Sequence, residues 1–327
     1  MDVFWYALTG LLFVGYLALE SLDFGVGMLF FLARTEPDRE RMHRTVVPLF
    51  LANEVWLVAF VGLLFGALPF LEGELLHAVR LPVVMLVCAW ILRDAALWFR
   101  TALPGAGWRR TWDVVLPVMS LVLAAGWGSV LAVLVRGLST DGDGHAVATF
   151  ADLVHPFSLA CALVAVAASL RQGTLFVITK LPDDSATGAR AGVLAQRLAW
   201  LLPALILVTA VMGAAVTDAP VAVAVIGILA AAAVYGSDRA RVAGRAGQAL
   251  SLGAAPLVAL PVMIGLVNGT TVLAARSGEG ALTLSRAIAD SSTLALLSSI
   301  VLPALIAVAL GQLWFWRVFP RASHQSL

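Results

Sequence analysis

The sequence predicts an all-α, polytopic membrane protein with about nine transmembrane helices. Of its 327 residues, 61% are hydrophobic and only 13% are charged, whereas soluble domains carry roughly a quarter charged residues. The apolar residues form runs of about 20, the length that crosses a hydrocarbon core roughly 30 Å thick at about 1.5 Å per residue. The alternation of apolar and polar residues expected of a membrane β-barrel does not occur in these runs.

Nine runs have the length and composition of spanning helices, and polar loops separate them. The first run follows the N-terminus directly, without the basic residues of a signal peptide, and is too long for one, so we expect it to remain as a helix. An arginine-rich segment separates the first two runs, the seventh run is the shortest, and no loop is long enough for a folded domain. The predicted spans, forming one transmembrane domain over residues 1–327, are 3–32, 45–71, 81–99, 114–135, 156–179, 193–216, 221–235, 250–274 and 293–319.

The basic residues predict the orientation of the chain. Most of the 21 Lys and Arg residues lie in the loops after the first, third, fifth and seventh spans and in the C-terminal tail. The alternate loops carry only Arg80, Arg136, Arg276 and Arg286. Since Lys and Arg accumulate on the cytoplasmic side, we expect the N-terminus outside and the C-terminus in the cytoplasm, which an odd number of spans requires.

Two acids in the first span are candidate proton carriers. Glu20 and Asp23 are three residues apart and share one helix face. Charges within the membrane are costly and therefore suggest function, and the repulsion between two neighbouring carboxylates favours a proton held between them. The alternative is structural: Asp23 pairs with an arginine of the next loop.

The second span carries Asn53 and Glu54 about ten residues from its start, where Glu54 requires a buried partner. Arg93, late in the third span, is the natural candidate. Such a pair serves either proton transfer or helix assembly alone.

The remaining reactive residues argue against a cofactor in this chain. Cys88 and Cys161 lie inside apolar runs, and we interpret both as buried packing residues. The five histidines fall in loops or at span ends, where they do not form an axial haem pair or a metal cluster: His43, His77, His145, His155 and His324. Because the arginines are spread over many short loops, we expect no nucleic-acid partner.

Several segments, taken in order, resemble subunit II of cytochrome bd-type quinol oxidases. The densest match is in the first 140 residues, and weaker similarity follows at 173–180 and 312–314. The matching segments are Glu20-Ser21-Leu22-Asp23-Phe24-Gly25-Val26-Gly27-Met28-Leu29, Asn53-Glu54-Val55-Trp56, Ile91-Leu92-Arg93 and Trp108-Arg109-Arg110-Thr111-Trp112-Asp113.

The sequence departs from the family pattern in the second span. Phe50, Leu51 and Ala52 stand where the family usually has Trp, Asp and Gly. In the family that Asp is associated with a proton pathway toward the haems. Ser21 and Leu22 replace Gly and Phe, Gln172 replaces a common His, and Trp98 replaces a common acid.

The resemblance implies a multi-pass subunit of the bacterial cytoplasmic membrane that pairs with a homologous haem-bearing subunit I. The complex would oxidise quinol and reduce dioxygen, with haems b and d in the partner and none in this chain. The resemblance is also compatible with a structural quinone, with membrane lipid and with a small third subunit. By matching position, Glu20, Asp23 and Glu54 would handle protons, with Asn53 and Arg93 as supporting polar groups.

Two other functions remain open. The intramembrane acids, together with an eighth span that Pro256 and Pro261 interrupt, also fit a proton-coupled secondary transporter. Leu51, in place of the family Asp, fits a structural paralogue without a proton role.

Overall fold

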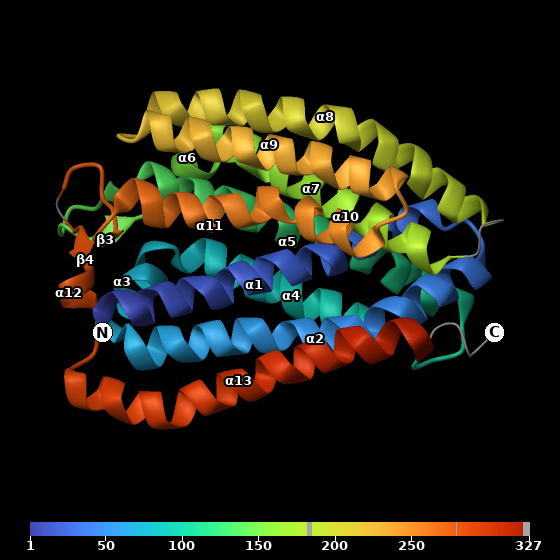
Figure 1. Cartoon of the computed structure of the whole chain (residues 1–327), viewed down its shortest axis with the longest axis horizontal. Helices are drawn as coiled ribbons and strands as arrows, with labels where there is room; N and C mark the ends of the chain where they lie inside the picture. Colours follow the sequence, from blue (N-terminus) through green and yellow to red (C-terminus); the bar gives the residue numbers. More distant parts are fainter. Residues whose placement is uncertain (182–184, 279, 323–327) are drawn as a thin grey trace.

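The structure is a computed structural model that describes residues 1–181, 185–278 and 280–322. Within these residues, nine helices are long and apolar enough to cross a membrane, which confirms the predicted fold class and number of spans. They run roughly alongside one another, and α1 begins at the end of the bundle opposite to that where α13 finishes (Figure 1).

The helices of the first half are α1 (Asp2–Leu29), η1 (Phe30–Leu32), α2 (Glu36–Ala67), α3 (Pro69–Ala78), α4 (Arg80–Phe99), α5 (Ala106–Arg136) and α6 (Phe150–Leu153). Those of the second half are α7 (Pro156–Lys180), α8 (Ala186–Val216), α9 (Pro220–Val242), α10 (Ala246–Gly253), α11 (Ala255–Asn268), α12 (Leu284–Ala287) and α13 (Ser291–Ala322). Two short antiparallel hairpins pair β1 (Ser139–Thr140) with β2 (Ala146–Val147) and β3 (Thr271–Leu273) with β4 (Leu282–Thr283).

Several helices extend beyond their apolar runs. α2 begins at Glu36 rather than at residue 45, because the Thr35 side chain caps it by accepting a hydrogen bond from the Asp38 amide. The run predicted to reach residue 71 breaks at Leu68, ahead of Pro69, and continues as the separate helix α3. An apolar run marks only the part of a helix within hydrocarbon, and so it misses the turns that lie in the polar interface.

One detail of the predicted spans was wrong. The seventh span, α9, has 23 residues, whereas the shortest of the nine is α4 with 20. The eighth span is interrupted near Pro256, as predicted, and consists of two helices, α10 and α11, which join at Ala254.

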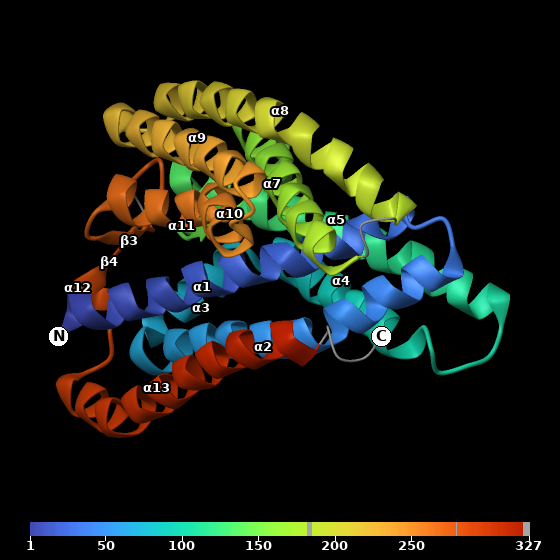
Figure 2. The same cartoon turned by 45° about the vertical axis from the view of Figure 1, so that its right-hand side comes forward.

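α1 lies at the centre of the bundle, where it packs against α7, α2, α5 and α11 (Figures 1 and 2). Its contact with α7 is backbone to backbone. A Cβ atom on Gly25 would overlap the Ser169 carbonyl oxygen, and one on Gly173 would overlap the Gly25 backbone. This close crossing places the second half of α1, including Glu20 and Asp23, in the interior of the bundle.

The edges of the bundle differ in their packing. α8 and α9 lie side by side at one edge, and α13 lies at the other beside α2 (Figures 1 and 2). Only 6% of the spanning part of α13 is buried, and its large apolar residues, among them Ile300 and Leu310, are exposed. This edge therefore presents a long apolar surface with little of this chain against it.

Cys88 was predicted to be buried and is exposed, whereas Cys161 is buried as expected. Cys88 lies on the outward side of α4 beside the exposed Met85 and Val87. Both environments are apolar, and so the apolar run did not distinguish the interior of the bundle from its outer surface.

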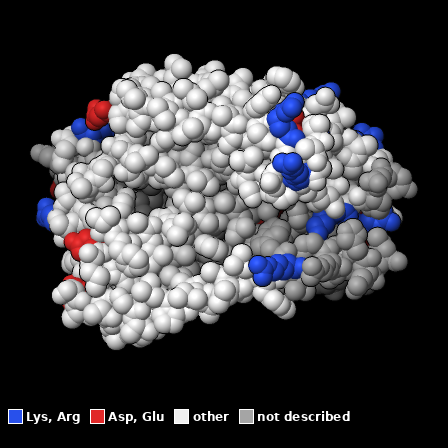
Figure 3. All heavy atoms as spheres, viewed as in Figure 1, with Lys and Arg blue, Asp and Glu red and all other residues white. Residues whose placement is uncertain are grey.

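On the face that Figure 3 shows, charged atoms gather toward the two ends of the molecule, and the surface between them has almost none. Basic side chains are most numerous at the end where α13 finishes (Figures 1 and 3). We call this the basic end. The β1–β2 and β3–β4 hairpins lie at the opposite end.

Candidate functional site

Charged and polar residues from three helices meet inside the bundle. Every candidate predicted from the sequence is among them, together with Asp94, which was not predicted as a site residue. We call this group the charge cluster. Its members are Glu20 and Asp23 from α1, Asn53 and Glu54 from α2, and Arg93 and Asp94 from α4.

Arg93 is the hub of the charge cluster, and its side chain is only 1% exposed. Its Nη1 donates a hydrogen bond to Glu20 Oε1, and its Nε donates to Asp94 Oδ1 at 3.0 Å. Its Nη2 lies 2.9 Å from Asp94 Oδ1 and 3.7 Å from Glu54 Oε1. The predicted approach of Glu54 to Arg93 is therefore present, but Glu20 and Asp94 are the closer partners.

Two aromatic rings complete the surroundings of Arg93. The centroids of Phe24 and Phe50 lie 5.5 and 5.4 Å from its Cζ atom, within the range of cation–π attraction. Phe50 is one of the residues at which this chain departs from the family pattern, and it packs against the hub of the charge cluster.

Asp23 is linked to α13 through Asn53. Asn53 Nδ2 donates to Asp23 Oδ2 at 2.8 Å, and Gln312 Nε2 in turn donates to Asn53 Oδ1 at 3.3 Å. The structural alternative, in which Asp23 pairs with a loop arginine, is not what the described residues show. Gln312 belongs to a segment of weak family similarity, and an amide near the end of a helix gives no sign of its partner.

The charge cluster is closed on one side and open on the other. Glu20 and Asp23 are 0% and 3% exposed, whereas the side chains of Glu54 and Asp94 are 20% and 22% exposed. Trp90 Nε1 holds Glu54 by donating to its Oε1 at 3.1 Å. The carboxyl groups thus form a short series from the outer surface of α2 and α4 into the bundle.

The charges of this group do not balance if every acid is ionised. Four carboxyl groups share one guanidinium, and Glu20 Oε2 and Asp23 Oδ1 are buried without a hydrogen-bond donor. Uncompensated charge within a bilayer is strongly unfavourable. Binding protons is the direct way for such a group to become neutral, and so the arrangement is chemically suited to hold and exchange protons.

Leu51 lies one helical turn before Glu54 and is 49% exposed. The position where the family usually carries an Asp therefore faces outward from the bundle. Glu54 and Asp94 are the partly exposed carboxyl groups of the charge cluster.

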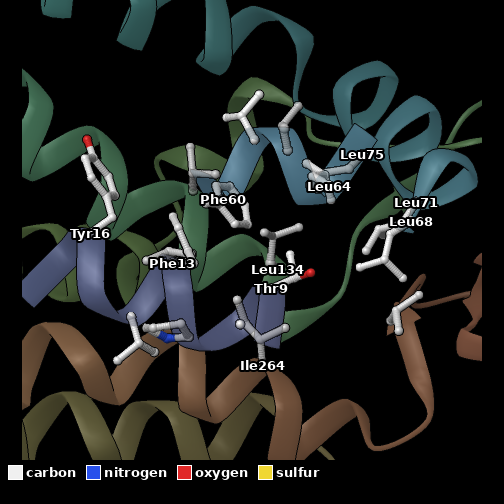
Figure 4. Close-up of a pocket in the computed structure, with 18 of the residues that line it drawn as sticks. Thr9, Phe13, Tyr16, Phe60, Leu64, Leu68, Leu71, Leu75, Leu134 and Ile264 are labelled. Carbon is white, nitrogen blue, oxygen red and sulfur yellow. The ribbon is translucent and has the colours of Figure 1, made fainter. Parts of the chain in front are cut away.

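A large apolar cavity of about 830 Å³ lies between α1, α2, α3, α4, α5 and α11. Phe13, Phe60, Leu64 and Leu134 line it, and Tyr16 lies toward one end (Figure 4). The Thr9 hydroxyl does not offer a free donor there, because it donates to the Trp5 carbonyl at 2.8 Å. The cavity wall is thus almost entirely hydrocarbon.

No group of three or more His, Cys, Asp or Glu side chains in the described part of the chain is arranged to hold a metal ion. His43 instead contacts the Leu97 carbonyl oxygen at 2.7 Å, and His324 lies outside the described residues. That this chain carries no haem stays a prediction.

Comparisons with known proteins agree on one family. The profile of the family described as cytochrome bd terminal oxidase subunit II matches residues 1–319. A Bacillus subtilis (strain 168) protein named cytochrome bd ubiquinol oxidase subunit 2 is 29% identical over 98% of this chain and 96% of its own length. An Escherichia coli (strain K12) protein named cytochrome bd-I ubiquinol oxidase subunit 2 is 26% identical over 53% of this chain and 47% of its own length.

A solved structure agrees in fold. A chain of the bd oxidase from Geobacillus thermodenitrificans superposes with a TM-score of 0.76 and 18% identity, covering 97% of this chain and 98% of that one. With the profile match over nearly the whole sequence, these findings show that the chain belongs to the cytochrome bd terminal oxidase subunit II family.

Proposed function

We propose that this chain is the non-haem subunit of a bacterial quinol:oxygen oxidoreductase, which scaffolds a homologous haem-bearing subunit I and passes protons toward it. The family and the names of the relatives support the subunit role. Haems b and d would lie in subunit I, and quinol would be oxidised by the complex rather than by this chain alone. A small third subunit is compatible with this arrangement but is not required by it.

The scaffolding role is supported by the surface of α2, α4 and α13. α13 is almost unburied within this chain, and large apolar residues such as Val58 and Ile91 are exposed on α2 and α4. A partner of similar apolar character would cover this surface. The link from Gln312 through Asn53 to Asp23 would then connect the covered helix to the charge cluster.

The observation that carries the proton role is the charge cluster itself. Its partly exposed acids, Glu54 and Asp94, lie at the same surface of α2 and α4 where we place the partner. Its fully buried acids, Glu20 and Asp23, keep oxygens without hydrogen-bond donors. Protons held by the buried acids could therefore leave through Glu54 and Asp94 toward subunit I, without an acid at Leu51.

The charge distribution supports the predicted orientation in the bacterial cytoplasmic membrane. We infer that the basic end faces the cytoplasm, with the N-terminus outside, because Lys and Arg are retained on that side. Protons for oxygen reduction would then enter from the basic end.

We infer that the apolar cavity holds a membrane component as a structural filler. A cavity of about 830 Å³ is far larger than one water molecule, and its hydrocarbon wall offers little to water. The isoprenoid tail of a quinone or the acyl chain of a lipid has matching chemistry.

Isolation of the chain from its native membrane tests the subunit role. We expect a second, haem-containing membrane subunit to co-purify, with haem b and d bands in the visible spectrum. Isolation of the chain alone, with a featureless visible spectrum, would contradict the proposal. It would favour a proton-coupled transporter, for which the broken eighth span is the supporting observation.

A single substitution tests the proton role. Glu54→Gln keeps the size and the hydrogen-bonding capacity of the side chain but cannot carry a proton, and we expect oxygen reduction to fall by about tenfold or more at unchanged haem content. Glu72→Gln, in α3 and outside the charge cluster, is the matched control. Unchanged turnover in Glu54→Gln would favour the purely structural paralogue.

A further inference from the structure

A second cavity, of about 620 Å³, lies at the basic end and has no part in the charge cluster. It is formed where η1 ends and where α2 and α5 begin. We call it the basic cavity. The residues that matter for its chemistry are Phe31, Glu36, Arg39, Arg109, Arg110 and Asp113.

The two acids of the basic cavity are already engaged by arginines. The buried Arg100 lies beside the cavity and donates to Asp113 Oδ1 at 2.6 Å and to Glu36 Oε1 at 2.9 Å. Arg39 Nη1 donates to the other Asp113 oxygen at 3.3 Å. This network fixes the cavity floor and leaves little carboxylate capacity for further cations.

The basic cavity carries more positive than negative charge. Arg109 approaches Glu36 only at 3.6 Å, with its side chain 44% exposed, and Arg110 is exposed at the same rim. With Arg39 and Arg100 included, four guanidinium groups lie around the two carboxylates of the basic cavity. An anion bound at this rim would neutralise the excess, and a guanidinium group offers paired N–H donors that match two phosphate oxygens.

Part of the wall of the basic cavity is apolar. Phe31 is 63% exposed and Val114 is 49% exposed, and both belong to helices that are long and apolar enough to cross a membrane. The cavity therefore combines arginines with exposed apolar surface at the basic end of these helices. A small soluble anion would satisfy the arginines but would leave the apolar wall uncovered.

We propose that the basic cavity binds the phosphodiester headgroup of an anionic phospholipid, with Arg109 and Arg110 on the phosphate and Phe31 and Val114 against the acyl chains. Basic pockets between helices at a membrane surface bind such headgroups. The volume is of the size of ordinary small-ligand sites. The site is independent of the proton role and does not require a haem-bearing partner.

Binding of phosphatidylglycerol to the purified protein, with whatever partner it retains, tests the proposal. The protein is placed in phosphatidylcholine nanodiscs with increasing phosphatidylglycerol, and retained lipid is counted by native mass spectrometry. We expect the double variant Arg109→Gln/Arg110→Gln to weaken phosphatidylglycerol binding by about thirtyfold, from about 1 kcal/mol for each arginine. Arg239→Gln/Arg245→Gln removes the same charge from exposed positions outside the cavity and should bind as the parent does.

Three results would overturn the proposal. One is an equal loss of phosphatidylglycerol binding in the control variant Arg239→Gln/Arg245→Gln, which would mean general attraction of the lipid to a charged surface. Another is displacement of the lipid by excess inorganic phosphate, which would mean a site for soluble anions. The third is unchanged binding in the Arg109/Arg110 variant while thermal unfolding shows that the variant is folded.

Discussion

Arg93 explains how four acids are tolerated inside an apolar bundle. Its guanidinium contacts Glu20, Asp94 and Glu54, and two aromatic rings flank it. Removing one partner of a buried ion pair leaves the other charge uncompensated, which is more harmful than removing both. The stability of the folded chain and the proposed proton role of the charge cluster would thus depend on the same side chain.

We expect Arg93→Gln to lower the free energy of unfolding by about 3 to 5 kcal/mol, because Glu20 loses its buried cation. The double variant Arg93→Gln/Glu20→Gln should recover a large part of this loss, since it replaces both charges by neutral groups. Thermal unfolding of the purified protein measures both variants. A double variant no more stable than Arg93→Gln would show that Glu20 is not the main partner.

Asp152, outside the spanning segments, gives a pH-dependent prediction. Burial by itself would raise its pKa, but hydrogen bonds from the Thr149 amide and hydroxyl, from Arg276 and from Ser139 lower the pKa to about 2. The unfolded chain has a pKa of about 3.9 for this residue. The stabilisation is therefore fully present above about pH 4 and is lost as the pH falls toward about 2.

Asp152→Asn should remove this pH dependence. The variant is expected to unfold at a lower temperature than the parent at pH 6, and the difference between them should shrink between about pH 4 and 2. Thermal unfolding curves of the parent and the variant, measured side by side over this pH range, check this prediction. A constant difference at all pH values would contradict the role given to the Asp152 carboxylate.

The residues of the site were largely predictable, but their contacts were not. Glu20, Asp23, Asn53, Glu54 and Arg93 could be selected because polar groups inside apolar runs are rare. The preference of Arg93 for Glu20 and Asp94 depends on how far α1 and α4 are rotated about their axes, which local sequence does not specify. Gln312 contacts a residue 259 positions away, and nothing in its own segment indicates that contact.

At the scale of elements, the crossing of α1 and α7 positions the buried acids. Gly25 and Gly173 allow the two backbones to touch, as small residues commonly do between membrane helices. Any larger side chain at this crossing would separate α1 from α7 and displace Glu20 and Asp23 from their partners on α2 and α4.

Gly173→Ala should therefore destabilise the protein by about 1 to 3 kcal/mol through overpacking. Gly192→Ala is the matched control, because a Cβ at Gly192 in α8 meets no atom within 4 Å. The yield of folded protein and its unfolding temperature measure both. Equal behaviour of the two variants would show that the α1–α7 crossing is not tight.

The spans themselves were predictable because a bilayer demands about 20 apolar residues for each crossing. Their ends were not, since α2, α5 and α8 extend into polar segments. The interruption of the eighth span was predictable from Pro256 and Pro261, and the break lies at Ala254, just before the first of them. Hydropathy measures the environment of a segment and says little about where hydrogen bonding begins or stops.

At the scale of the whole molecule, the two ends differ in charge and the two edges differ in burial. Basic side chains gather at the basic end on the face that Figure 3 shows, and α13 forms an apolar edge with little packed against it. These asymmetries would orient the chain in the membrane and leave one lateral surface for a partner.

Labelling from one side of the membrane tests the orientation. Gly142→Cys, in the β1–β2 hairpin, should react with an impermeant maleimide in intact cells, whereas Arg34→Cys, at the basic end, should react only after permeabilisation. Both positions are exposed. The reverse pattern would place the N-terminus in the cytoplasm.

Proton uptake during a single turnover tests the central claim most directly, namely that the charge cluster passes protons to the oxygen-reducing partner. The fully reduced complex is mixed with oxygen in the presence of a pH indicator, while haem oxidation is followed by absorbance. We predict that Glu54→Gln slows proton uptake by about tenfold or more with haem content unchanged. Proton uptake at the parental rate in this variant would contradict the account.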